Sequence, residues 1–381
     1  MEDPLFNHIR PFDGEEIPVA AKRLSESREF LSLFSRMLGW NEEVITGMLQ
    51  EVTTPEEFQS RFFMPVIKEL TRTTTGGVTV SGMENLKKNE AYLFVSNHRD
   101  IILDSAILNT LLIENGYLYC QAAIGSNLLI NDWVTDMVRL NSCFIIERNL
   151  PVKEMVTSAG LRSNYIRKLV ETKKNSVWIA QREGRTKNGD DRTQHALLKM
   201  FKMSGPKEFA ENFKELRVVP LAISYEWEPC DDMKTEELYK RGSGEYVKTP
   251  EDDMKSMYRG LAEQKGKVHF AIGKPIDNEL KAIGRYSNNG DRVAALADRV
   301  DTVIHGNYKL WPNNYIAHDL MRGSTRFVRA YSDNEKECFI ETMKTKIGRL
   351  DGNRSILNGI YLSMYANPVR NYLEVETRDG K

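Results

Sequence analysis

A histidine followed by two acidic residues stands at the end of a short apolar run in this sequence. Residues 92–104 read Tyr-Leu-Phe-Val-Ser-Asn-His-Arg-Asp-Ile-Ile-Leu-Asp, so His98 follows Asn97 and precedes Asp100 and Asp104. An imidazole beside a carboxylate can act as a general base, because the carboxylate orients the ring and stabilises its protonated form. This segment alone fits an ordinary surface histidine in a loop equally well.

Three later segments also end an apolar run with polar residues. They are Phe-Ile-Ile-Glu-Arg at 144–148, Trp-Ile-Ala-Gln-Arg-Glu-Gly-Arg-Thr-Lys at 178–187 and Val-Val-Pro-Leu-Ala-Ile-Ser-Tyr-Glu at 218–226. If these runs are parallel strands, their polar ends meet at the sheet edge where open α/β sheets bind ligands. The basic residues of this group are Arg148, Arg182, Arg185 and Lys187. Such side chains bind phosphate oxygens, so the sequence predicts a base beside an anion-binding cluster, with solvated surface charges as the alternative.

The elements that must position these residues alternate along the chain. Apolar runs predict strands at 78–81, 93–95, 117–123, 143–146, 176–180, 216–224 and 267–272. Between them lie helical patterns, including 101–112, for which Ser96 or Asn97 could serve as the N-cap. This alternation predicts an α/β fold with a mixed, largely parallel sheet flanked by helices.

The two ends of the chain are predicted to be helical. One amphipathic pattern runs from Pro18 to a closing Gly39, and Thr-Pro-Glu-Glu at 54–57 has the composition of a helix start. The Thr-Thr-Thr-Gly-Gly run at 73–77 breaks the helical pattern. We therefore expect an N-terminal helical domain (1–75), an α/β domain (76–280) and a helical C-terminal extension (281–381).

Composition excludes several classes of protein. With 41% hydrophobic and 28% charged residues the chain resembles soluble globular proteins, and it has neither a membrane-spanning apolar run nor a secretory leader pattern. Four scattered cysteines give no metal-binding pair and no disulfide framework, and a net charge of −1 gives no support for a nucleic-acid partner. These features predict a cytoplasmic protein.

The four polar-ended segments, in this order and spacing, resemble the four sequence blocks of the glycerolipid acyltransferase superfamily, which includes glycerol-3-phosphate and lysophosphatidate acyltransferases. The resemblance covers about residues 78–275. Members of that family have Asn-His followed by four residues and Asp, then Glu-Gly with a nearby Arg, and a Val-Pro strand. The resemblance implies transfer of a fatty acyl group from an acyl-CoA or acyl carrier protein thioester to a hydroxyl of glycerol 3-phosphate or a lysophospholipid, without a metal or organic cofactor.

The resemblance also implies roles for individual residues. His98 would be the general base, while substrate-binding roles fall to Asn97, Arg148, Glu183, Gly184, Arg185 and Lys187. Five residues separate His98 from Asp104 where the family has four, so either a local bulge restores the geometry or Asp100 is the partner. We favour Asp104, because apolar residues precede it as they precede the family's aspartate. Arg182 stands where the family usually has proline.

Two alternatives to this function remain open at this point. A thioester hydrolase on the same scaffold would use the same base, and a lipid-binding protein without catalysis would retain only the fold. For the acyltransferase, the lipid substrates predict peripheral association with the inner face of a membrane. Candidate contact surfaces are Phe30, Leu31 and Phe34, or the aromatic C-terminal helices, while an ordinary core-facing helix is the alternative.

Overall fold

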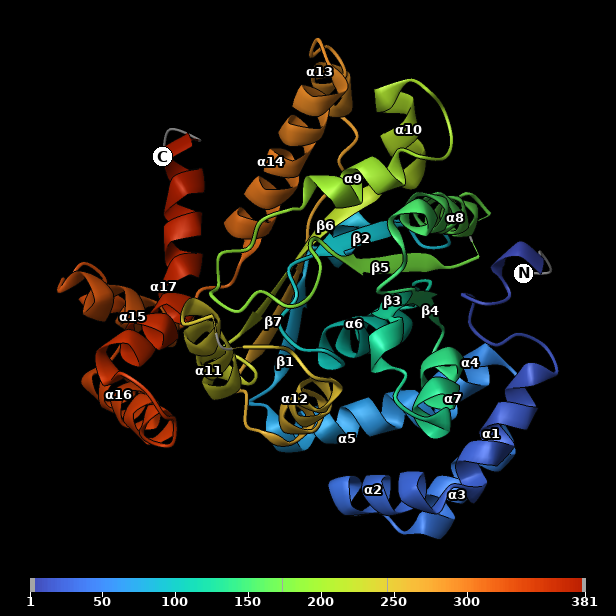
Figure 1. Cartoon of the computed structure of the whole chain (residues 1–381), viewed down its shortest axis with the longest axis horizontal. Helices are drawn as coiled ribbons and strands as arrows, with labels where there is room; N and C mark the ends of the chain where they lie inside the picture. Colours follow the sequence, from blue (N-terminus) through green and yellow to red (C-terminus); the bar gives the residue numbers. More distant parts are fainter. Residues whose placement is uncertain (1–3, 173, 245, 379–381) are drawn as a thin grey trace.

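A seven-stranded sheet forms the centre of the computed structural model, which describes residues 4–172, 174–244 and 246–378 (Figure 1). The strands are β1 (Val78–Ser81), β2 (Leu93–Ser96), β3 (Cys120–Gly125), β4 (Cys143–Ile146), β5 (Ser176–Ala180), β6 (Val218–Tyr225) and β7 (Val268–Ile272). Their order in the sheet is β1-β7-β6-β2-β5-β3-β4. From β6 to β4 all neighbours are parallel, whereas β7 is antiparallel to β6 and parallel to β1. The predicted mixed, largely parallel α/β fold is confirmed.

The central strands are buried because helices cover both faces of the sheet. Leu93 and Val95 point to the face covered by α8 (Val152–Glu171), α9 (His195–Phe201), α10 (Phe209–Leu216) and α14 (Asn289–Asn307). Phe94, between them, points to the opposite face and packs with α6 (Leu103–Glu114) and the N-terminal helices. The register sets Ser96, at the end of β2, opposite Ala180 of β5 and Leu221 of β6. The segments that follow β2 and β5 therefore begin close together, beside β6.

The N-terminal helices are α1 (Glu16–Glu26), α2 (Arg28–Leu38), α3 (Glu42–Gln50), α4 (Pro55–Glu57) and α5 (Met64–Thr74). The single helix expected from Pro18 to Gly39 is wrong, because Ser27 is extended and its hydroxyl accepts a hydrogen bond from the amide of Phe30, which starts α2. Gly39 does end α2, in the left-handed conformation, and Thr54 forms the expected capping box with Glu57.

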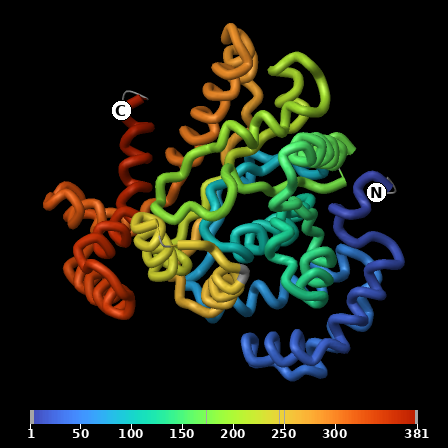
Figure 2. Tube along the Cα trace, in the orientation of Figure 1, coloured from blue at the N-terminus to red at the C-terminus, as the bar shows by residue number. Residues whose placement is uncertain are grey.

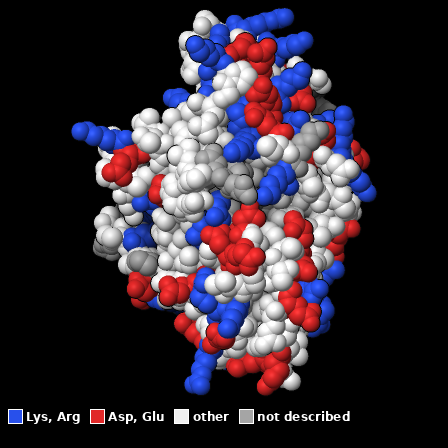
Figure 3. Space-filling model, turned by 90° about the vertical axis from the view of Figure 1, so that its right-hand side faces the viewer, with Lys and Arg blue, Asp and Glu red and all other residues white. Residues whose placement is uncertain are grey.

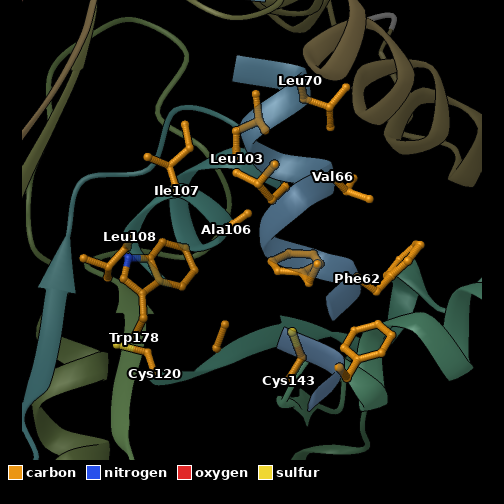
Figure 4. Packing of buried hydrophobic residues seen from close by; sticks show 14 of the residues in the cluster. Phe62, Val66, Leu70, Leu103, Ala106, Ile107, Leu108, Cys120, Cys143 and Trp178 are labelled. Carbon is orange, nitrogen blue, oxygen red and sulfur yellow. The ribbon is translucent and has the colours of Figure 1, made fainter. Parts of the chain in front are cut away.

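The apolar residues of α2 belong to the protein core. Phe30 is fully buried, and Leu31 and Phe34 are each only 8% exposed, so the prediction that they form a membrane-contact surface is wrong. They join one apolar cluster with the sheet. Figure 4 shows part of this cluster, where residues of α5 and α6 lie beside Cys120, Cys143 and Trp178 of the sheet. The N-terminal helices thus complete a core that the sheet also uses.

The C-terminal helices α15 (Pro312–Arg322), α16 (Asp333–Gly348) and α17 (Arg354–Arg378) have an apolar cluster of their own. Tyr361 and Tyr365 of α17 donate hydrogen bonds of 2.6 and 2.7 Å to Oδ2 of Asp231, so these aromatic residues are also buried and not a membrane surface. Asp231 begins α11 (Asp231–Gly242), which α12 (Pro250–Ala262) follows. The division into three domains stays a prediction.

The two ends of the chain lie far apart, and charged side chains of both signs are mixed on the surface. The N-terminal and C-terminal helices lie on different sides of the sheet (Figure 2). On the face shown in Figure 3, lysine and arginine side chains alternate with aspartate and glutamate side chains. Within the described ranges, no helix combines the length and the apolar character that crossing a membrane requires.

Candidate active site

His98 lies just beyond the end of β2 and is hydrogen-bonded to Asp104. The distance from His98 Nδ1 to Asp104 Oδ2 is 2.8 Å. Asp104 is fully buried in the first turn of α6, whereas 13% of the His98 side chain is exposed. A carboxylate can only accept a hydrogen bond, so this contact places the proton of the neutral imidazole on Nδ1 and leaves Nε2 as the basic nitrogen. The pair therefore has the tautomer that general-base chemistry needs.

The carboxylate of Asp104 is held by three further donors. Its Oδ2 accepts the backbone amides of Arg99 (2.6 Å) and Asp100 (3.1 Å), and its Oδ1 accepts the hydroxyl of Tyr225 (2.8 Å). Burial and the negative charge of Asp104 raise the pKa of Tyr225 well above its usual value, so the phenol stays protonated as a donor. The segment after His98 thus wraps around this carboxylate. The extra residue between His98 and Asp104 lies in the non-helical segment before α6, which begins at Leu103.

Asp100 has a different position. Its Oδ1 accepts the amides of Ile102 (2.9 Å) and Leu103 (2.8 Å), so it satisfies backbone donors at the start of α6. The expected capping by Ser96 or Asn97 is wrong, as is the expected helix start at residue 101. Geometry places Asp104, and not Asp100, beside the imidazole.

Asn97 connects two strands. It is fully buried, and its side-chain amide exchanges two hydrogen bonds of 2.8 Å with the backbone N–H and C=O of Ile223 in β6. The ring of Trp178 meets that of His98 edge to face at 5.4 Å, and its Nε1 donates to Ser96 Oγ. These contacts fix the exit of β2 and one side of the imidazole, so Asn97 acts on the site through the backbone.

The segment after β5 runs alongside His98. The amide of Gln181 donates to the carbonyl of Ser96 (2.7 Å), and the amide of Thr186 donates to the carbonyl of His98 (3.1 Å). Between these anchors lies Gly184, which is exposed and has φ of +69°, a left-handed conformation that favours glycine. The Glu-Gly-Arg sequence is therefore a turn held next to the imidazole.

The predicted basic residues differ in how far their charges are already compensated. Arg148 forms an ion pair with Glu183, and Lys187 forms one with Glu237. Burial lowers the pKa of Lys187, although the ion pair with Glu237 acts in the opposite direction and raises it. Arg185 forms no ion pair among the described residues, and its buried Nη1 has no hydrogen-bond partner there. The buried Nε of Arg182 also has no hydrogen-bond partner among these residues. Arg185 is thus the predicted phosphate ligand whose guanidinium is least occupied.

A buried ion-pair network that sequence reasoning missed lies behind the histidine. Arg99 is fully buried; its Nη2 lies 2.5 Å from Asp191 and its Nη1 3.6 Å from Glu228. Burial opposes the charge of Arg99, but the two carboxylates outweigh it and raise the pKa of the guanidinium. Lys234 Nζ donates to the Arg99 carbonyl at 2.8 Å. The residue next to His98 is therefore immobilised on both its side chain and its backbone.

An apolar cavity of about 140 Å³ opens beside this segment. Its walls come from α2, α5, the start of α6, α7 (Asp132–Leu140) and α12, and include Phe34, Val66, Ile101, Ser105, Trp133 and Met257. Ile101 directly follows Asp100, which places the cavity next to the His98 segment. The residues that line this cavity are spread over more than 200 positions of the sequence, so no local sequence pattern predicts the cavity.

The described residues contain no group of three or more histidine, cysteine, aspartate or glutamate side chains arranged to hold a metal ion. Cys120, Cys143 and Cys230 are buried free thiols, and burial raises the pKa of each. Nucleophilic chemistry by a thiolate therefore has no support from these three residues.

A protein family and a solved structure are similar to this chain. A family model described as Acyltransferase matches residues 77–224. Among solved structures, the crystal structure of the 1-acyl-sn-glycerophosphate (LPA) acyltransferase PlsC from Thermotoga maritima is similar at 16% sequence identity and a TM-score of 0.37, covering 74% of this chain and 92% of that chain. No curated protein matches the sequence. The matched segment contains β1 to β5, all but the last residue of β6, His98 and Asp104, so this part of the chain is similar to the acyltransferase family, as the four sequence blocks predict.

Proposed function

We propose that this protein transfers a fatty acyl group from an acyl-CoA or acyl carrier protein thioester to a hydroxyl of glycerol 3-phosphate or a lysophospholipid, without a metal or organic cofactor. The observation that carries the proposal is the hydrogen-bonded pair of His98 and Asp104 beside an apolar cavity. The pair supplies a base for a hydroxyl group, and the cavity offers space of the right polarity for an acyl chain.

In the proposed reaction, Nε2 of His98 accepts the proton of the acceptor hydroxyl while its oxygen attacks the thioester carbonyl. Asp104 keeps the proton on Nδ1 and stabilises the imidazolium that forms. The tetrahedral intermediate then collapses: the carbon–sulfur bond breaks, the imidazolium returns its proton to the thiolate, and the acyl ester is released. The backbone N–H of Gly184 and its neighbours are the proposed donors to the oxyanion, because the N–H of Glu183 already donates to Gln194 Oε1.

The acceptor phosphate is proposed to bind at the basic residues near this turn. Arg185 offers a guanidinium without an ionic partner among the described residues. Arg148 would exchange the exposed carboxylate of Glu183 for a phosphate group, since that pair is open to solvent. Lys187 is already neutralised by Glu237, so we assign it the smallest share.

Such lipid substrates imply a cytoplasmic protein bound peripherally to the inner face of a membrane. Because Phe30, Leu31 and Phe34 lie in the core, the contact surface must be elsewhere. Val152 and Val156 at the start of α8 are 81% and 65% exposed and form an apolar alternative. Co-sedimentation with anionic vesicles at low salt tests this: a Val152→Asp, Val156→Asp double variant should sediment less than wild type, and no sedimentation of wild type would contradict peripheral binding.

The function as a whole is tested by incubating the purified protein with labelled acyl-CoA and acyl carrier protein donors and a panel of acceptors, followed by identification of the lipid product by mass. The proposal expects an ester on glycerol 3-phosphate or a lysophospholipid. Release of free fatty acid without dependence on an acceptor would instead indicate a thioester hydrolase. Absence of any turnover with retained lipid binding would indicate a non-catalytic lipid-binding protein.

A further inference from the structure

A basic groove lies between α15 and α17, outside the segment 77–224 that the acyltransferase family model matches. These two helices are at the left of Figure 1. The groove has a volume of about 610 Å³ and a single acidic side chain, that of Glu374, in its lining. Its basic lining residues are His318, Arg322, Arg326, Arg370 and Arg378.

Two of the four arginines are not neutralised by the protein. Arg370 pairs with Asp190 at 3.0 Å and Arg378 pairs with Asp298 at 2.6 Å. By contrast, in the part of the chain that the structure describes, neither Arg322 nor Arg326 forms an ion pair. The groove therefore contains two arginines, Arg322 and Arg326, without an ion pair among the described residues.

The backbone that presents Arg326 is held in place by Asp319, which is 3% exposed. Its carboxylate accepts hydrogen bonds from Ser324 Oγ (2.6 Å), the amide of Phe327 (2.9 Å) and the hydroxyl of Tyr331 (3.0 Å). The guanidinium of Arg326 lies over the ring of Phe327, 5.2 Å from its centre. These contacts fix the segment after α15, so one wall of the groove is organised before any ligand arrives.

The opposite wall is one face of α17. Arg370, Glu374 and Arg378 follow one another at intervals of four residues, which places them in a row along the helix. His318 of α15 also lines the groove, and its buried Nδ1, which has no hydrogen-bond partner among the described residues, lies 3.7 Å from Asp319 Oδ1. Burial lowers the pKa of His318, and the charges of Arg322 and Arg326 act in the same direction while Asp319 opposes them.

We propose that this groove binds a phosphate group, carried either by a small soluble molecule or by a lipid headgroup. A phosphate monoester has a charge of about −1.5 to −2 at neutral pH, which matches the two uncompensated arginines. The planar guanidinium donates paired hydrogen bonds to phosphate oxygens, which makes arginine the preferred side chain for such a ligand. This site goes beyond the proposed transfer reaction, because it lies on the C-terminal helices and not at His98.

The test compares two double variants of the full chain, each of which removes two positive charges. Arg322→Gln, Arg326→Gln removes the uncompensated groove arginines, whereas Arg285→Gln, Arg349→Gln removes two exposed arginines that do not line the groove. Thermal melting first shows that both are folded. Isothermal titration calorimetry with inorganic phosphate at low ionic strength, and co-sedimentation with phosphatidylcholine vesicles with and without phosphatidic acid, then measure the two sources of phosphate.

We expect the groove variant to bind at least one of the two probes at least about tenfold more weakly than wild type, and the control variant to stay within about twofold. Groove-dependent binding of inorganic phosphate alone identifies a soluble ligand, and groove-dependent binding to phosphatidic acid vesicles alone identifies a lipid headgroup. Equal affinities for wild type and the groove variant with both probes, or no binding of either probe by wild type, would overturn the proposal. Acyl transfer to a soluble acceptor is measured separately and should be unchanged in the groove variant. The phosphate-binding result can therefore be interpreted even if the protein proves not to be an acyltransferase.

Discussion

The Asp104→Asn substitution is expected to slow acyl transfer by about three orders of magnitude while the protein stays folded. His98 and Asp104 are 2.8 Å apart and both are largely shielded from solvent. When the imidazole takes up a proton, two opposite charges about 4 Å apart attract by about 4 kcal/mol at an effective dielectric constant of about 20. Asparagine removes this attraction at the transition state, and about 1.4 kcal/mol corresponds to a tenfold change in rate, which gives a factor of about 10³.

The matched control is Asp100→Asn. Asp100 touches the start of α6 through Oδ1, and asparagine can keep an acceptor oxygen for the amides of Ile102 and Leu103. We expect kcat of this variant to stay within about tenfold of wild type, with at most about 1 kcal/mol lost in the free energy of unfolding. Steady-state kcat at saturating donor, with melting temperature as the folding control, distinguishes the two. A large loss confined to Asp100→Asn would refute the assignment, and little loss in either variant would remove the His–Asp pair from the mechanism.

Three further outcomes are expected. Ser105→Phe fills part of the apolar cavity, so the preferred acyl donor should become shorter in a chain-length series, and an unchanged preference would place the acyl chain elsewhere. Tyr225→Phe removes one donor to buried Asp104 and should lower the free energy of unfolding by about 1–3 kcal/mol in urea titrations, while kcat falls less than in Asp104→Asn. Burial and nearby Asp231 raise the pKa of Glu263 from 4.5 to about 7; the folded state then holds a proton that the unfolded chain loses above about pH 4.5, so stability falls as the pH rises from about 4.5 to about 7. This fall should be shallower in Glu263→Gln and unchanged in the exposed control Glu337→Gln.

The strands were predictable because each is a short apolar run bounded by polar or glycine residues. The expected ranges 78–81, 143–146 and 176–180 are those of β1, β4 and β5 in the structure. The start of α6 was not predictable from capping preferences, because Ser96 and Asn97 are engaged by partners on other strands, and Ile223 is 126 positions away. Asp100 takes over the role that local sequence assigned to them.

The site was predictable where its residues share one segment and not where distant ones complete it. The sequence identified His98 and left Asp100 and Asp104 as competing partners, since one residue of spacing rotates a helical side chain by about 100°. Tyr225, Trp178 and the cavity lining reach His98 only through the fold. The difference between Arg185 and Lys187 likewise depends on Glu237, which lies 50 positions from Lys187.

The amphipathic pattern of α2 does not distinguish a membrane-binding helix from a core-facing one. Phe30 and Phe34 lie on one face of α2 beside basic residues, a pattern that fits both a membrane-binding helix and a helix packed on a core. The structure buries both side chains, with Phe34 also lining the apolar cavity. Only the tertiary partner, which the local sequence does not contain, distinguishes the two cases.

If His98 is the general base of an acyl transfer, the turnover of a His98→Ala variant must fall. The His98 side chain lies just beyond the end of β2 and its removal leaves the three other donors to Asp104 in place, so the variant should keep the wild-type circular dichroism spectrum, with only a modest decrease in melting temperature. With a labelled acyl thioester and the acceptor that wild type uses, ester formation should fall by about 10²- to 10⁴-fold. Near-normal ester formation by the folded variant would contradict the assignment of His98.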